Sequence, residues 1–512
     1  MTDDSESGGH GYNRRLFLKT TGATAIGAGL AGCGGGDGGG DGGDGGDGGG
    51  DVSTPTPKVE TVVQTRTVEG DVETVVKTEE VTPEGNNFEG LEINYWNQMN
   101  VQSRQARSVS EALANNFEQF TGATVNVNWS GYGDVIGATW RNQFSQGNYP
   151  VVYDSVTTWD GQFVEGGWVK PFDEYMDQFS DQLISSIEWI FPTLRNQYRG
   201  FEGDDVWEVP FGFLLQLPFV VRMDHLDEAG LSRDRLPPED YDDLIDIATT
   251  LQEDGPGEFG HQIHGTKFDA TDCRLPNMAV AEGGQQGLFL NEDWSDTRWD
   301  NDVWKKVVRQ WVEIFTEHEL SSPGTPNHDD EAMVQEISSG RTSMNSGDTQ
   351  NHPDMLDTMP ELMEAGDVQW VPQWPGDHGG GMGIIQPYGL GITVPPEGAD
   401  SDEWNRKQQA GIELIKLFLT KDFQRNLFEN FGLFPIRDDV WDDFPDSSGS
   451  HRLYETATTM AQNSDFAWAA HPQSVSVQYN VPAPHIQEAL NGNKSPEQAC
   501  DDIAADVREQ LL

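Results

Sequence analysis

The chain contains many side chains that could act as acids, bases or nucleophiles, but their spacing does not define a catalytic site. Of the 512 residues, 86 are Asp or Glu. A glycosidase needs two carboxyls about 5–10 Å apart, and no motif here places two of them together. Ser448-Gly449-Ser450 lacks the Gly-x-Ser-x-Gly spacing of a serine-hydrolase elbow, and His261-x-x-His264 stands apart from the further ligands that a metal site requires. The spacing of these residues therefore predicts neither a catalytic site nor a metal site.

The excess of acids sets further limits on function. Lys and Arg number 31, the formal net charge is −55, and residues 88–512 alone hold 71 acids and 25 bases. Such a charge repels nucleic acid, whose binders need basic patches. It fits adaptation to high salt, because at molar ionic strength the Debye length is about 3 Å and self-repulsion is screened. We expect an extreme halophile, an archaeon, as the source, and we interpret most acids as solvated surface.

The N-terminal segment has the features of an export signal. Arg14-Arg15 precede Leu16-Phe17-Leu18-Lys19, a Gly/Ala-rich apolar run follows, and Leu30-Ala31-Gly32-Cys33 ends it. The arginine pair resembles a twin-arginine signal, and the ending resembles the lipobox that is cut before a lipid-modified cysteine. The run is too short and too rich in glycine for a permanent membrane span, which needs about 20 apolar residues. We expect residues 1–33 to be the signal and Cys33 to carry the lipid, on the extracellular face of the membrane.

A linker follows the predicted signal. Residues 34–51 are Gly with interspersed Asp, which cannot bury apolar surface. Residues 52–87 are rich in Thr, Val and Glu and repeat Val-Glu-Thr-Val-Val at 59–63 and 72–76. The alternation would suit a strand pair, but a lone hairpin is barely stable in water. We therefore expect residues 34–87 to form a disordered linker and extended stalk.

The remaining 425 residues are too long for one ordinary core and contain units typical of a parallel sheet. Residues 91–96 alternate like a strand, and Ser108-Val109-Ser110-Glu111 reads as a capping box that opens a helix ending at Gly122. Residues 125–129 alternate again, and 149–154 form a short buried-type strand before a predicted loop, 155–160. Ligands in open α/β sheets bind beyond the carboxyl ends of strands, so the segments after Trp96 and Tyr153 are the first candidate site.

Several short motifs follow one another in the order typical of one family. They are Phe117-x-x-x-Thr121-Gly122-x-x-Val125, the strand-like run 207–223, Pro237-Pro238-Glu239-Asp240-Tyr241 opening a helix, 340–347 (GRTSMNSG), Tyr388-Gly389-Leu390-Gly391-Ile392, 432–441 (GLFPIRDDVW) and 489–499 (ALNGNKSPEQA). Together they resemble the extracellular solute-binding proteins of ABC importers, in the branch that includes maltose-binding protein. The resemblance covers residues 88–512.

The resemblance implies an α/β fold of two lobes, each a sheet flanked by helices, joined by crossover strands that act as a hinge. The family has no catalytic residues or cofactor, and closure of the lobes on a solute is what the permease recognises. Carried over to this chain, the crossovers fall near 210–216 and 368–374. Lobe one takes residues 88–215 and 375–420, and lobe two takes 216–374 and 421–512.

The resemblance also implies a site of aromatic faces and polar side chains, because a sugar has apolar C–H faces and a rim of hydroxyls. The candidate ligand-binding residues at matching positions are Trp96, Asn97, Thr158, Trp159, Asp160, Gln216, Asp348, Trp374, Tyr388 and Tyr479. The family's Pro-Asp-Val is Pro150-Val151-Val152 here, and Asp348 replaces an aromatic. Few basic residues fall at these positions, which disfavours an anion. We expect a monomer that binds a sugar or other neutral polyol and delivers it to the transmembrane subunits of an ABC permease.

The cysteines, the sequons and the overall function each allow more than one interpretation. Cys273 and Cys500 could pair or remain two buried thiols, and the sequons at Asn128 and Asn493 could carry glycans on the cell exterior. The alternatives to a solute receptor are a secreted, lipid-anchored glycan hydrolase and a cell-surface structural or adhesion protein. The body shows no repeat of the kind that an adhesin would have.

Overall fold

The computed structural model describes residues 61–68, 71–78, 88–98, 104–131, 138–201, 203–215, 219–266, 271, 274–347, 349–372, 374, 385–443 and 468–511. Contacts divide the chain into two units, Met1–Val81 and Thr82–Leu512. The predicted signal with Cys33, most of the predicted linker, and the candidates Gln216 and Asp348 lie outside the described residues.

The first unit contains a strand pair. β1 (Thr61–Val68) and β2 (Asp71–Thr78) pair antiparallel, with Val63 opposite Val76 and Arg66 opposite Glu73. The expectation of an extended stalk is therefore wrong for these residues. Both segments are rich in β-branched Val and Thr, which favour extended backbone, and only two residues separate them.

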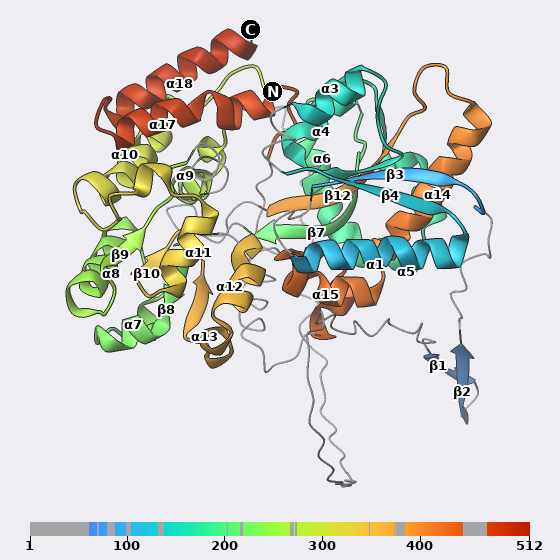
Figure 1. Cartoon of the computed structure of the whole chain (residues 1–512), viewed down its shortest axis with the longest axis horizontal. Helices are drawn as coiled ribbons and strands as arrows, with labels where there is room; N and C mark the ends of the chain where they lie inside the picture. Colours follow the sequence, from blue (N-terminus) through green and yellow to red (C-terminus); the bar gives the residue numbers. More distant parts are fainter. Residues whose placement is uncertain are drawn as a thin grey trace, which may run out of the picture. The chain divides into compact units, whose positions relative to one another are not determined.

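The second unit begins with a seven-stranded sheet, which defines lobe one (Figure 1). The strand order is β13-β7-β12-β5-β3-β4, with β6 also paired to β12. β3 is parallel to β4 and β5, as predicted, whereas β12 is antiparallel to β5 and β7. The strands are β3 (Glu92–Asn97), β4 (Thr124–Trp129), β5 (Val152–Ser155), β6 (Val169–Lys170), β7 (Val209–Leu215), β12 (Ile385–Thr393) and β13 (Phe434–Pro435).

Helices cover both faces of this sheet (Figure 1). They are α1 (Arg104–Thr121), α3 (Thr139–Ser145), α4 (Thr157–Glu165), α5 (Asp181–Ile187), α6 (Phe191–Gln197), α14 (Ser401–Phe418) and α15 (Lys421–Phe431). Two predicted boundaries are wrong. α1 begins at Arg104, one turn before the predicted capping box at Ser108, and most of the predicted loop 155–160 belongs to α4.

A four-stranded sheet defines lobe two, in the order β11-β8-β10-β9. Its strands are β8 (Phe219–Arg222), β9 (Phe259–Gln262), β10 (Thr342–Asn345) and β11 (Val368–Val371). The helices of this lobe are α7 (Met223–Glu228), α8 (Tyr241–Asp254), α9 (Leu275–Gly283), α10 (Asp302–Thr316), α11 (Asp330–Ser338), α12 (His352–Thr358), α13 (Pro360–Ala365), α17 (Pro482–Leu490) and α18 (Pro496–Leu511).

Helix α10 shows why these segments are helical. The Asn301 side chain caps its start by accepting from Trp304 N at 2.9 Å. Trp304, Val307, Val308 and Trp311 then follow helical spacing and are buried against the core of lobe two. α8 likewise begins at Tyr241 after an Asp240 cap, as the sequence predicts.

The chain passes between the two sheets three times. It leaves the larger sheet after β7, returns at β12, and leaves it again after residue 443. The first two passages fall at the predicted crossovers. The third does not follow the predicted boundary at residue 420, because α15 packs on α1 and β7 and because β13 pairs with β7 in the larger sheet.

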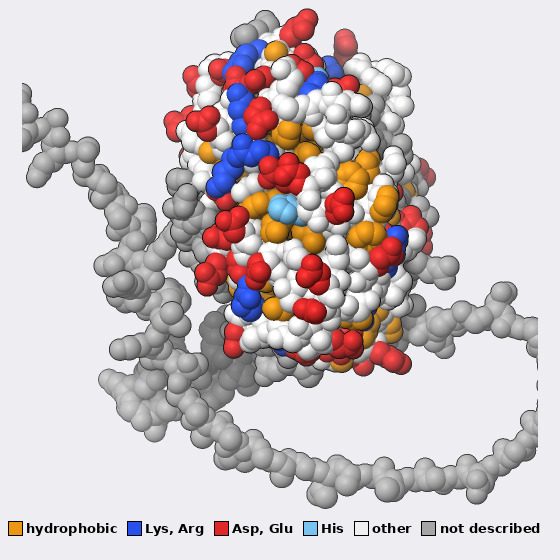
Figure 2. All heavy atoms as spheres, turned by 90° about the vertical axis from the view of Figure 1, so that its left-hand side faces the viewer, with side chains coloured by type: hydrophobic (Ala, Val, Ile, Leu, Met, Phe, Trp, Pro, Cys, Tyr) orange, Lys and Arg blue, Asp and Glu red, His pale blue; other side chains and the backbone are white. Residues whose placement is uncertain are grey.

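Figure 2 shows acidic side chains spread over one face of lobe two, with basic side chains gathered toward one side of it. Some acids of lobe two pair with bases, as Asp300 does with Arg508 and Asp501 with Lys305. Among the helices that the structure describes, none has both the length and the apolar character needed to cross a bilayer.

Candidate functional site

The carboxyl ends of β3 and β5 bring polar groups together at one edge of the larger sheet. Tyr95 Oη donates to Asp154 Oδ1 at 2.5 Å, Asn97 Nδ2 donates to Tyr95 Oη at 2.7 Å, and the Gln98 amide donates to Asp154 Oδ2 at 2.7 Å. Burial, followed by the charge of Asp154, raises the pKa of Tyr95 well above its usual value, so its hydroxyl remains a donor. The predicted residue Asn97 is thus held in place at the edge where ligands bind in such sheets.

The predicted tryptophans Trp96 and Trp159 belong to one aromatic cluster. Trp140 lies between them, with ring centroids 5.5 Å from Trp96 and 5.8 Å from Trp159. Trp159 is only 1% exposed, and its indole N–H donates to the Asp154 carbonyl at 3.1 Å. Trp96 is half-buried and keeps part of its surface exposed. Trp96 can therefore offer a face to a ligand, whereas Trp159 supports the wall behind it.

Thr158 and Asp160 are buried in α4, next to Trp159. Asp160 Oδ2 accepts a hydrogen bond from Tyr198 Oη at 2.8 Å and another from Ser155 Oγ. Burial raises the pKa of Asp160 to about 7 in spite of these hydrogen bonds. Asp160 is therefore a group of the lobe interior, where it faces protein groups and not the solvent.

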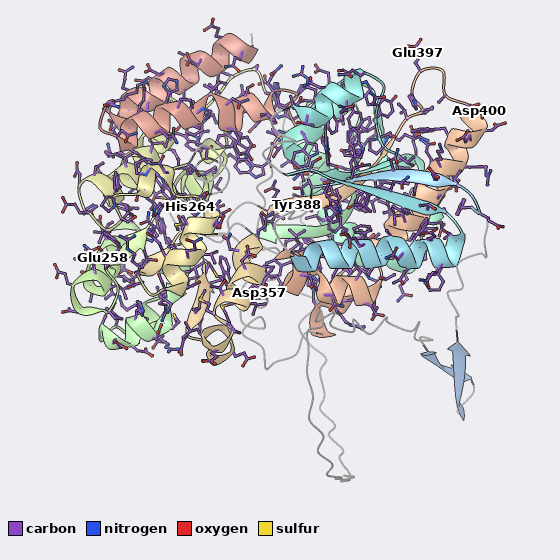
Figure 3. All side chains as sticks on the ribbon, viewed as in Figure 1. Glu258, His264, Asp357, Tyr388, Glu397 and Asp400 are labelled. Carbon is purple, nitrogen blue, oxygen red and sulfur yellow. The ribbon has the colours of Figure 1, made fainter. Side chains whose placement is uncertain are left out.

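Tyr388 contacts the other lobe. It lies on β12 (Figure 3), and its hydroxyl accepts a hydrogen bond from Gln350 Nε2 at 2.6 Å. Gln350 lies in the short helix η8 (Thr349–Asn351), which follows β10 of the smaller sheet. Beside it, His352 of α12 stacks on Phe428 of α15 with 4.2 Å between ring centroids. This pair of contacts joins the lobes near the second crossover.

A second contact joins the lobes through Trp294, which precedes α10. The Arg199 guanidinium lies 5.4 Å from the Trp294 ring centroid, and Arg199 Nε donates to the Glu292 carbonyl at 3.2 Å. Phe201 lies edge-on to the same indole at 5.8 Å. Gly200 leaves room for it, since a β-carbon there would lie 2.1 Å from Trp294 Cε3. The segment after α6 in lobe one therefore fits closely against a loop of lobe two.

A small pocket adjoins this contact. Trp468 and Phe289 form its aromatic wall, with parallel rings 4.9 Å apart. The indole N–H of Trp468 is buried without a hydrogen-bond partner among the described residues. The lining residues are Arg199, Leu288, Phe289, Leu290, Trp468, Ala469, Ser474, Val477 and Gln478. The lining thus combines aromatic and aliphatic side chains with an amide, a hydroxyl and a guanidinium, a mixture typical of small-molecule sites.

The two remaining described candidates lie inside lobe two. Trp374 is fully buried, donates from its indole to Glu282 Oε1 at 3.3 Å, and stacks on Phe219. Tyr479 is fully buried in the π-helical turn η10 (Ser476–Asn480), whose Val477 and Gln478 line the pocket. Neither side chain lines the pocket itself. Sequence reasoning missed Arg199, Phe289 and Trp468, because these three positions are far apart in the chain and match no family motif.

The two histidines of the His261-x-x-His264 pair are buried in lobe two, and Figure 3 labels His264. His264 lies between Ser346 Oγ at 3.0 Å and Asp330 Oδ1 at 2.9 Å, and Arg274 also donates to Asp330 Oδ1 at 2.6 Å. Burial lowers the pKa of His264 to about 4 and that of His261 to about 3. Both imidazoles are therefore neutral at pH 7. Cys500, the partner considered for Cys273, is a buried free thiol.

Comparisons with known proteins agree with this geometry. Residues 102–424, more than half of the chain, match the family described as bacterial extracellular solute-binding protein. The erythritol/L-threitol-binding protein of Mycolicibacterium smegmatis is 23% identical over 288 residues, which span 52% of this chain and 57% of that relative. The chain thus matches little more than half the length of this curated relative.

Two solved structures share the fold. A solute-binding protein of Agrobacterium radiobacter K84, in complex with ribitol, has a TM-score of 0.67 at 17% identity and covers 83% of this chain and 99% of its own. A solute-binding protein of Thermotoga lettingae TMO, bound with alpha-D-tagatose, has a TM-score of 0.63 at 19% identity. The match covers 82% of this chain and 100% of that protein. Both support the α/β two-lobed architecture. By its family match over residues 102–424, the chain belongs to the bacterial extracellular solute-binding proteins.

Proposed function

We propose that the protein is the substrate-binding component of an ABC importer, which captures a small sugar or polyol between its lobes and delivers it to the permease subunits. The pocket between Arg199 of lobe one and the Phe289–Trp468 pair of lobe two carries this proposal. A ligand that touches both lobes favours their closure, because it binds the closed arrangement better than the open one. Neither a cofactor nor a catalytic residue takes part.

The ligand class is inferred from the pocket and from the relatives. Stacked aromatic rings suit the C–H face of a sugar or polyol, while Ser474, Gln478 and Arg199 offer hydrogen bonds to hydroxyls. The relatives bind erythritol or threitol, ribitol and tagatose, all small neutral polyhydroxylated molecules. We therefore favour a neutral sugar or polyol as the ligand class. The alternative of a glycan hydrolase predicts turnover of the bound molecule.

A thermal-shift screen of the full-length protein in molar salt tests the function. The panel holds erythritol, L-threitol, ribitol, tagatose and maltose, with amino acids and glycerol phosphate as other classes. A ligand that binds only the folded state stabilises it by about 2.7 kcal/mol at a hundredfold excess over Kd. A rise in Tm with one polyol or sugar, which is recovered unchanged, supports the proposal. A rise only with another class would refute the ligand class, and product formation would favour the hydrolase.

The proposed location is the outer face of the cell membrane, where the monomer is held through a lipid on Cys33 after twin-arginine export. The motif at 14–19 and the lipobox at 30–33 support this, as does the run of Gly and Asp that follows. The large negative charge supports a halophilic archaeon as the source. Replacement of Cys33 by Ala should release the protein from the membrane fraction into the medium. Retention of the Cys33→Ala variant at the membrane would refute the lipid anchor.

A further inference from the structure

Two buried carboxyls meet at one serine in lobe one. Ser155 ends β5, Asp160 lies in α4, and Glu208 directly precedes β7, and none of the three is exposed. Ser155 Oγ contacts Asp160 Oδ2 and lies 2.7 Å from Glu208 Oε2. Tyr198 Oη, 2.8 Å away, donates a further hydrogen bond to Asp160 Oδ2. Four oxygen-bearing side chains therefore form one connected group without access to water.

The hydrogens in this group can be counted. A serine hydroxyl has one hydrogen to donate, whereas an ionised carboxylate has none. Ser155 contacts two carboxyl oxygens, so one of these contacts needs a hydrogen that comes from a carboxyl. Asp160 already accepts from Tyr198 and is therefore better suited to carry the charge. Glu208 then holds the extra proton and donates it to Ser155, which in turn donates to Asp160.

The surroundings supply no cation to replace that proton. Tyr153, Tyr175 and Tyr198 face the two carboxyls, and burial, as the first cause, raises the pKa of each of these tyrosines. His471, on the adjacent segment 468–471, has its pKa lowered to about 4 by burial. No lysine or arginine is among the main causes of the pKa shift of either carboxyl. Glu208 Oε1 also lacks a hydrogen-bond partner among the described residues, so a charge on Glu208 would be poorly compensated.

Electrostatics also favours one proton held between the two carboxyls. Burial, and next the charge of Asp160, raise the pKa of Glu208 well above its ordinary value. Two close carboxyls in a dry environment cannot both ionise cheaply, so the pair keeps one proton. A calcium ion would need six or more oxygens at about 2.3–2.6 Å. The 2.7 Å separation of Ser155 Oγ and Glu208 Oε2 is that of a hydrogen bond, closer than neighbouring oxygens around such an ion.

The group lies where the connections between the lobes begin. Glu208 precedes β7, and β7 pairs with β12 through Val209 and Leu390. Glycines on β12 make room for it: a β-carbon at Gly389 would lie 2.8 Å from Glu208 Cβ, and one at Gly391 would lie 2.2 Å from the Tyr153 ring. This explains the Gly-Leu-Gly run of that strand.

The third connection touches the same group. A β-carbon at Gly161, next to Asp160, would lie 2.0 Å from the Ala470 carbonyl oxygen. The Ala470 amide also donates to the Gln197 carbonyl at 2.8 Å, next to Tyr198. The described ends of the three connections, at β7, β12 and Ala470, therefore lie next to residues of this group or to their neighbours in the sequence.

We propose that Asp160, Ser155 and Glu208 form a proton-binding site at the base of the hinge, which holds one proton between two carboxyls at neutral pH and makes the stability of this region depend on pH. Because the folded state binds this proton more tightly than the unfolded chain, its contribution to stability is present at acid pH. It is fully present below about pH 4, the ordinary pKa of a carboxyl in the unfolded chain. It is lost as the pH rises through the raised pKa values that the two carboxyls have in the folded state. The proposal does not depend on which ligand the protein binds.

Infrared spectroscopy of the full-length protein tests the proton directly. The wild type should show the carbonyl stretch of a protonated carboxyl at pH 7.5, and Glu208→Gln should lose it. Glu165→Gln replaces an exposed carboxyl on the same helix as Asp160 and is the matched control. It should keep the band. Absence of the band in the wild type, or its persistence in a folded Glu208→Gln variant, would overturn the proposal.

Urea unfolding between pH 5 and pH 9 gives a second readout. The midpoint of Glu208→Gln should rise relative to that of the wild type as the pH increases, because the amide has no proton to lose. Glu165→Gln should stay parallel to the wild type. If Glu208→Gln does not fold, Asp160→Asn serves the same comparison. Equal pH profiles, or a midpoint that depends on added calcium or sodium and not on pH, would overturn the proposal.

Discussion

Substitution of Gly200 by Ala should weaken the contact between the lobes. A β-carbon at residue 200 would lie 2.1 Å from Cε3 and 2.2 Å from Cζ3 of Trp294, which is well inside van der Waals contact. Overpacking of this kind costs about 1–3 kcal/mol. The lobes can relieve the clash by moving apart, so the cost falls on their closed arrangement. An energy of about 1–3 kcal/mol changes an open–closed equilibrium by roughly 5–150-fold.

Small-angle X-ray scattering and ligand titration measure this effect. The Gly200→Ala variant should have a larger radius of gyration than the wild type and a weaker affinity for the ligand identified by thermal shift. Trp294→Ala removes the group that clashes, so the double variant should regain the compactness and affinity of Trp294→Ala alone. Unchanged scattering and affinity in Gly200→Ala, or a double variant no better than Gly200→Ala, would refute the interlobe role of Trp294.

Three further predictions concern single side chains. Tyr388→Phe removes the acceptor of the Gln350 hydrogen bond. We expect the binding free energy of the ligand to weaken by about 0.5–1.5 kcal/mol, which calorimetry would show as a Kd up to roughly tenfold weaker. An unchanged Kd would contradict a role of this contact in closure. Burial raises the pKa of Cys500 to about 12, so a maleimide should label it only after unfolding, as peptide mapping can show, whereas rapid labelling of the native protein would contradict its burial. Burial lowers the pKa of His352 to about 3, so this group favours folding above pH 6.5 and loses that contribution as the pH falls from there. His352→Phe keeps the stack on Phe428. In this variant the urea midpoint should fall less steeply below pH 6.5 than in the wild type, and an equally steep fall would contradict the role of His352 in acid unfolding.

Local sequence patterns were enough to predict two strands of the larger sheet and the end of the helix between them. The alternation of residues 91–96 and 125–129 marks β3 and β4, and Gly122, with φ of 73°, ends α1 as expected. The order of the family motifs predicts the two lobes and the first two crossovers. These features depend on residues that are neighbours in the sequence.

The errors have long-range causes. Segment 155–160 reads as a loop because it contains Thr157 and Thr158 and is followed by Gly161, but α4 needs that glycine where the Ala470 carbonyl approaches. β13 has only two residues, too few for a periodic signal, and its pairing with β7 decides the lobe of the preceding helix. The pocket combines Arg199, Phe289 and Trp468, whose proximity arises only from the fold.

Binding of a small neutral polyol or sugar at the Trp468 wall between the lobes can be measured directly. Isothermal titration of the full-length protein in molar salt, with ribitol, erythritol, L-threitol and tagatose, tests it most directly when Trp468→Ala and Trp468→Phe are measured beside the wild type. We predict one-to-one binding of at least one of these compounds, about tenfold or more weaker in Trp468→Ala, since loss of a buried aromatic contact costs more than 1.4 kcal/mol. Trp468→Phe keeps the stack and should bind more tightly than Trp468→Ala. Binding of equal affinity in a folded Trp468→Ala variant would contradict a ligand site at this wall. Binding of another class of molecule, with no binding of any polyol or sugar, would contradict the proposed ligand class.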